Sequence, residues 1–118
     1  MAKYMLLIHG DEQQWGAMTA AERQALEAAH AAFRAAAGSR VIGGEELEPA
    51  SMGTTLRVDP SGGVLTTDGP FLDTKEALGG YYLLEAADLD EVIALAAQLP
   101  EVHGGHSGVE IRPVVNHG

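Results

Sequence analysis

Apolar residues recur along the chain with two periods, one typical of strands and the other of helices. Turn residues at Asp59–Gly63 join two strand-like segments into a hairpin. Residues 68–80 contain Gly and Pro and are predicted as a turn or a short helical piece. The strand-like segments, which are short apolar runs or alternate apolar with polar residues, are Tyr4–Ile8, Val41–Leu47, Thr54–Val58, Val64–Thr67, Tyr81–Ala86 and Val109–Val115.

Two segments have helical spacing and clear end signals. The first begins at Thr19, which forms the capping-box pattern with Glu22, and ends at Gly38. The second begins at Asp88 and is closed by Pro100. The apolar stripes predicted to face the core are Leu26, Ala29, Phe33 and Ala37 in the first helix, and Leu89, Val92, Ile93, Ala96 and Leu99 in the second.

The order of these elements is β-α-β-β-β-β-α-β, and its two βαβ crossovers predict an α+β fold. We expect a ferredoxin-like sandwich, an antiparallel sheet with two helices on one face, and a single domain over residues 1–118. The first strand is apolar on both faces, with Leu6 on one and Met5 and Leu7 on the other. Because two helices cover only one face, we expect a second copy of the chain to cover the other, which makes a homodimer.

Composition narrows the classes of function. The 118 residues include 7 basic and 17 acidic side chains, a formal net charge of −10, which disfavours binding to nucleic acids and to anionic membrane surfaces. The longest apolar run, Val92–Ala97, is far shorter than the ~20 residues of a spanning helix. No signal-peptide pattern is present at the start, so we expect a cytoplasmic protein. The absence of cysteine excludes disulfides, thiol catalysis and thiolate metal sites.

Several motifs resemble the DGPF branch of the YCII-related family. They are Thr67–Phe71, Thr74–Glu76 and Leu78–Tyr82, together with Lys3–Ile8, Gly43–Leu47, Thr54–Arg57 and Val109–Val114. The resemblance implies a ferredoxin-like fold assembled as a dimeric α/β barrel. It also implies an enzymatic role for a characteristic histidine and aspartate, since one relative is described as a dehydrochlorinase. Some DGPF members accompany sigma factors, which implies a regulatory role instead.

His30 is the most informative candidate for catalysis. It lies between Leu26 and Phe33 on the apolar stripe of the first helix, where a partly buried imidazole paired with a carboxylate can act as a general base. Asp68, at a strand end, is the predicted partner and matches the aspartate of the family. The structural alternative is a core histidine bonded to a backbone carbonyl, with Asp68 bonding only its own turn.

Candidate substrate-binding residues carry charge or a hydroxyl group near strand ends. Each also has a structural alternative, namely an exposed ion pair, packing in the core or a charged edge that deters aggregation. A cation among them would favour an anionic or phenolate substrate. These candidates are Glu45, Arg57, Lys75, Tyr81, Glu110 and Arg112.

We expect neither a metal nor a cofactor. His103 and His106 have H-x-x-H spacing, but a glycine loop lacks the helical preorganisation that such a metal motif needs. No phosphate loop or nucleophile elbow is present. The expected function is proton transfer with elimination or isomerisation on a small organic molecule, with His30 as base or acid and Asp68 orienting it. The alternative is a non-catalytic module that binds a small ligand or a transcriptional partner such as a sigma factor.

Overall fold

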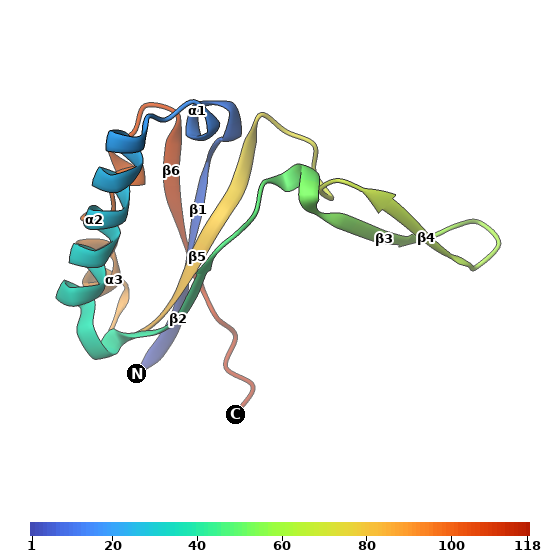
Figure 1. Cartoon of the computed structure of the whole chain (residues 1–118). Coiled ribbons are helices and arrows are strands. Elements are labelled where there is room, and N and C mark those ends of the chain that lie inside the picture. Colours follow the sequence, from blue (N-terminus) through green and yellow to red (C-terminus); the bar gives the residue numbers. More distant parts are fainter.

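The computed structural model describes residues 1–118 and contains a four-stranded antiparallel sheet in the order β2-β5-β1-β6 (Figure 1). The strands are β1 (Ala2–Asp11), β2 (Val41–Glu46), β5 (Glu76–Ala86) and β6 (Ser107–Pro113). Strand β5 lies between β1 and β2 and is antiparallel to both, which is the split βαβ arrangement. The predicted ferredoxin-like α+β fold is confirmed.

The helices are α1 (Glu12–Gly16), α2 (Ala20–Ala37) and α3 (Leu89–Ala96), and α2 and α3 lie on the same face of the sheet (Figure 1). The predicted capping box is confirmed, because the Glu22 N–H donates to Thr19 Oγ1 at 3.1 Å and the Thr19 N–H donates to Glu22 Oε1 at 2.9 Å. Short 3-10 turns cover η1 (Gly38–Arg40), η2 (Ala50–Met52) and η3 (Pro100–Val102). No helix combines the length and the apolar character needed to cross a membrane.

The core lies between the helices and the sheet. Its largest fully buried side chains are Phe33, Leu6, Leu84, Leu99 and Val92. The prediction for α3 is wrong at two positions, since Leu89 and Ile93 are 45% and 48% exposed. This eight-residue helix is buried along the stripe of Val92 and Ala96, with Leu95 packed beside it, and Leu89 and Ile93 lie outside that stripe.

Strand β5 begins earlier than predicted, at Glu76 rather than Tyr81. Residues 76–80 pair with the end of β1, although their glycines give no strand pattern. The glycines make room for the ring of Trp15, since a Cβ at Gly79 would lie 2.7 Å from the ring and a Cβ at Gly10 would lie 2.5 Å from it. The indole therefore packs directly against the backbone of two paired strands.

The hairpin of β3 (Thr54–Val58) and β4 (Val64–Asp68) forms a separate two-stranded sheet. It projects away from the side of the main sheet that the helices leave open (Figure 1). Its strands follow the predicted hairpin, with Val58 opposite Val64 next to the turn. We call this hairpin the arm.

Candidate functional site

Four polar side chains from three elements meet beneath helix α2. The His30 Nδ1 atom lies 2.7 Å from the hydroxyl of Tyr82, and His30 Nε2 lies 2.7 Å from Glu101 Oε2. Arg34 Nη1 donates to the same Tyr82 hydroxyl at 3.3 Å. Both ring nitrogens of His30 are thus engaged, one by a phenol and the other by a carboxylate.

Local sequence explains how these groups come together. His30 and Arg34 are four residues apart on α2, so both side chains lie on one helix face. Tyr82 alternates with Leu84 and Ala86 on the helix-facing side of β5, and its ring packs 4.8 Å from that of Phe33. Pro100 starts the 3-10 turn that carries Glu101.

A single assignment of hydrogens satisfies the three contacts. Arg34 donates to the Tyr82 oxygen, the Tyr82 O–H donates to His30 Nδ1, and His30 Nε2–H donates to Glu101 Oε2. Burial raises the pKa of Tyr82 above its ordinary value of 10.0, although Arg34 has the opposite effect. The phenol therefore keeps its proton at neutral pH and can donate it in a hydrogen bond. The four residues therefore form a hydrogen-bonded chain with His30 at its centre, which we call the relay.

Glu101 is unusual for a carboxylate because only 6% of its side chain is exposed. Its Oε2 atom is bonded to His30, but its Oε1 atom is buried and has no hydrogen-bond partner. A buried carboxylate oxygen without a donor is costly, so this oxygen can accept a further hydrogen bond.

The relay lies in the wall of a cleft of about 1140 Å³. The cleft runs between α2 and the β2 edge of the sheet, and residues of α1 and β5 also line it. Its wall includes Trp15, Leu26 and Tyr81 together with the backbone of Gly43 and Gly44. A space of this size and mixed lining suits a small organic molecule.

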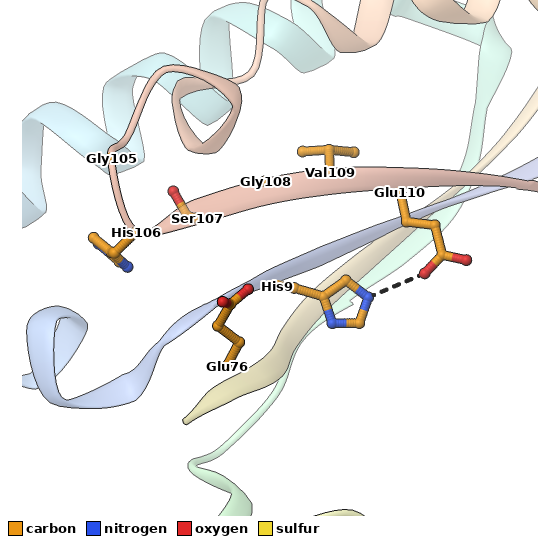
Figure 2. Close-up of a pocket in the computed structure, with 8 residues that line it drawn as sticks. All are labelled: His9, Glu76, Gly105, His106, Ser107, Gly108, Val109 and Glu110. Atoms are coloured by element: carbon orange, nitrogen blue, oxygen red, sulfur yellow. Dashed lines mark ion pairs between the residues drawn. The ribbon is translucent and has the colours of Figure 1, made fainter. Parts of the chain in front are cut away.

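A second, smaller pocket of about 400 Å³ lies at the other edge of the sheet, beside β6 (Figure 2). His9 Nε2 lies 3.3 Å from Glu110 Oε1, and Arg112 donates to Glu110 Oε2 at 2.5 Å and 2.9 Å. Arg112 and, to a lesser degree, His9 lower the pKa of Glu110. His106 is held against the end of β1, since its Nδ1 accepts from the Asp11 N–H at 3.1 Å.

Comparison with known proteins identifies the family. The model of the YCII-related domain matches residues 2–116. The chain belongs to the YCII-related family. An uncharacterized protein of Rhizobium meliloti (strain 1021) is 38% identical to it over 68 residues, which are 58% of this chain and 54% of that protein. The match thus spans about half the length of this relative.

In this YCII-related protein, His30 and Asp68 are not brought together within one chain. Both ring nitrogens of His30 are bonded to Tyr82 and Glu101, whereas Asp68 ends β4 on the projecting arm (Figure 1). The carboxylate partner therefore comes from the turn after α3 and not from the DGPF segment. A part for Asp68 in binding or catalysis remains a prediction.

The other predicted residues are divided among four places. Glu45 and Tyr81 line the cleft, and Glu110 and Arg112 form the ion pair beside the smaller pocket. Arg57 lies on the arm, with its guanidinium 4.2 Å from the ring centre of Phe71. Separately, Lys75 is 78% exposed and its Nζ atom lies 3.8 Å from Asp11 Oδ2. The structure therefore does not bring Lys75 or Arg112 to His30.

The sequence analysis missed Arg34, Tyr82 and Glu101. Arg34 had a usable signal, because it follows His30 by one helical turn. Tyr82 had only the signal of an aromatic strand residue, which accounts for its buried ring but not for the bond of its hydroxyl to His30. Glu101 had no signal, since it lies 71 residues from His30 in a turn without periodicity.

Proposed function

We propose that this YCII-related protein is a cofactor-independent enzyme that moves a proton on a small organic molecule bound in the cleft. The observation that carries the proposal is the relay of Arg34, Tyr82, His30 and Glu101 in the cleft wall. A phenol, an imidazole and a carboxylate in series can accept a proton and hold it. We assign the protein to elimination or isomerisation chemistry.

The proposed step begins with transfer of the Tyr82 proton to His30 Nδ1. The resulting imidazolium is paired with Glu101, and Arg34 stabilises the Tyr82 phenolate. The phenolate then removes a proton from a substrate carbon beside a carbonyl group. In isomerisation, the electron pair left on that carbon shifts a double bond, Tyr82 returns a proton to the far carbon, and His30 reprotonates Tyr82. In elimination, the electron pair forms a double bond as a leaving group departs from the neighbouring carbon, and the proton held by His30 passes to solvent.

Deuterium exchange tests this proposal without knowledge of the natural substrate. The protein is incubated in D₂O with a panel of small ketones and lactones, and deuterium incorporated next to the carbonyl group is measured by mass spectrometry. We expect exchange of at least one compound with the native chain and its loss in Tyr82→Phe and His30→Gln. Asp90→Asn, an exposed change on α3, is the control that should leave exchange intact.

Circular dichroism must show that the two relay variants are folded. No exchange across the panel, or undiminished exchange in folded His30→Gln, would contradict the proposal. In that case the alternative is a non-catalytic module that binds a ligand or a transcriptional partner such as a sigma factor, and the exposed apolar residues of the arm would be its contact surface.

We also propose that the protein is a homodimer packed through the open face of its sheet. Met5, Leu7, Tyr81 and Leu83 lie on that face and are only partly buried in one chain. The arm projects on the same side, so in such a dimer it would reach over the partner (Figure 1). An isolated two-stranded hairpin is marginally stable, and the arm needs this cover.

Light scattering measures the mass of the particle directly. We expect about twice the chain mass of 12.3 kDa at micromolar concentration. Val58→Lys should weaken the dimer, since Val58 is 71% exposed and pairs with Val64 on one face of the arm. Thr67→Lys, on the opposite face of the same hairpin, is the matched control. A monomeric mass for the native chain would contradict the proposal.

A further inference from the structure

The cleft beside the relay has an uneven charge. Six of the 17 acidic residues of the chain line it, against only two of the seven basic residues. The carboxylates and guanidinium groups concerned are Glu12, Glu27, Glu45, Glu46, Glu48 and Glu101, and Arg23 and Arg34. Carboxylates are thus concentrated at this cleft relative to the rest of the chain.

The two arginines do not offset these carboxylates through ion pairs. Arg23 Nη2 donates to the backbone oxygen of Trp15 at 3.1 Å, and Arg34 donates to the Tyr82 hydroxyl. Four of the six glutamates, at positions 27, 45, 46 and 48, take part in no ion pair or side-chain hydrogen bond in the chain. The field in the cleft is therefore negative and attracts cations.

Glu101 supplies an independent indication of what is bound. Its side chain is 94% buried in the cleft wall, and its Oε1 atom lacks the donor that such an oxygen needs. A ligand N–H group is a suitable donor, and a charged one makes a stronger bond than a neutral one. An ionised carboxylate group of a ligand offers no donor and is repelled.

The rest of the lining suits an organic cation rather than a bare metal ion. Trp15 gives the cleft an aromatic side chain, and Leu26 and Met18 give it apolar ones. Aromatic rings attract ammonium groups through their faces, and apolar side chains accept a hydrocarbon part. No group of three or more histidine and acidic side chains has metal-binding geometry in the structure.

We infer that the cleft binds a small organic ammonium compound, with its cationic nitrogen toward the glutamates and its hydrocarbon part against the aromatic wall. This inference rests on the proposed function, because it names the substrate class of the same cleft. It replaces the expectation of an anionic substrate, since Lys75 and Arg112 do not line the cleft.

Two probes of matched shape and opposite charge test the inference by binding alone. They are 2-phenylethylammonium and 3-phenylpropionate, followed by NMR through the indole N–H of Trp15 and the amides of Gly43 and Gly44. We expect the ammonium to shift these signals and the carboxylate to leave them unchanged. Raising the ionic strength from 20 to 200 mM should weaken binding of the ammonium probe severalfold, because salt screens charges at the mouth of a cleft.

Substitutions locate the binding. Glu101→Gln should lower the affinity for the ammonium probe about tenfold, which is the usual scale for loss of one charge-assisted hydrogen bond. The triple change Glu45→Gln, Glu46→Gln and Glu48→Gln alters exposed residues only, and it keeps the test valid if Glu101→Gln does not fold. Asp90→Asn is the control for charge outside the cleft.

Equal or tighter binding of the carboxylate would overturn the inference, and so would absence of ammonium binding. Undiminished ammonium binding in the folded Glu101→Gln and triple variants would also overturn it. Deuterium exchange, measured beside ammonium binding on the native chain, separates this result from the proposed function. Ammonium binding without deuterium exchange would refute the proposed enzymatic function and support the ligand class. Deuterium exchange without ammonium binding would support the enzymatic function and refute the ligand class.

Discussion

Tyr82→Phe is the sharpest test of the relay because it deletes a single oxygen. The ring remains to pack 4.8 Å from Phe33 and to stack over His30 at 5.8 Å. What is lost is the bond of 2.7 Å to His30 Nδ1 and the longer bond of 3.3 Å from Arg34. The change therefore isolates the hydrogen bonds of the hydroxyl from the apolar contacts of the ring.

The larger part of the cost comes from His30. A buried polar atom left without its partner costs about 1–3 kcal/mol. Because 16% of the His30 side chain is exposed, water can replace part of the lost bond. Arg34 is exposed and contributes little. We expect the free energy of unfolding to fall by about 1–2 kcal/mol.

Urea unfolding at one fixed protein concentration, followed by the fluorescence of the single tryptophan, measures this loss. Since burial raises the pKa of Tyr82, the folded state holds the phenol proton more tightly than the unfolded state. The native chain should therefore lose stability as the pH rises above 10, and Tyr82→Phe should not share this loss. The difference in free energy of unfolding between the native chain and Tyr82→Phe should therefore narrow above pH 10.

Tyr4→Phe is the control, because Tyr4 is also buried but its hydroxyl does not join the relay. The reasoning fails if Tyr82→Phe unfolds at the same urea concentration as the native chain at pH 8. It also fails if the difference in stability stays constant from pH 9 to pH 11.

Further predictions concern the helices. Thr19→Ala should cost about 1 kcal/mol in urea unfolding at pH 7, because it removes the cap of α2. Hydrogen bonds with Thr19 lower the pKa of Glu22 in the folded state. The stability that this glutamate contributes is therefore present above pH 4.5 and is lost as the pH falls through its lowered pKa. The difference in free energy of unfolding between the native chain and Thr19→Ala should thus be smaller at pH 3 than at pH 7. Phe33→Ala should lower the free energy of unfolding by about 3–5 kcal/mol, because Phe33 is fully buried, whereas Ile93→Ala should lower it by less than about 1 kcal/mol. Similar losses for the two variants would show that α3 is buried on a different side.

Local signals in the sequence predicted the fold well. The capping box at Thr19 and the cap at Asp88 act through neighbours three residues away, so the sequence alone contains both partners. The start of β5 was not predictable in the same way, because Gly79 and Gly80 carry no side chains and show no alternation. The role of Gly79 depends on Trp15 and that of Gly80 on the backbone of β2 at Glu45, and both neighbours arrive only on folding.

Of the four side chains that meet beneath α2, the sequence indicated His30 and not its partners. His30 was recognised because helical spacing places it between Leu26 and Phe33 on a buried stripe. The choice of Asp68 as the partner of His30 followed a family motif, whereas the contact with Glu101 is determined by how the turn after α3 packs beneath α2. Packing between segments 71 residues apart leaves no periodic trace in a single sequence.

The arm has a consequence for how the chain survives in a cell. Its strands pair only with each other, and the side chains of Leu56, Val58 and Val64 are 63%, 71% and 72% exposed. A segment with so few stabilising contacts opens locally at little cost, so it is where a protease would cut first. If the arm is covered only by a second copy, its rate of cleavage would rise as the protein is diluted. Degradation would then remove unassembled chains and spare assembled ones.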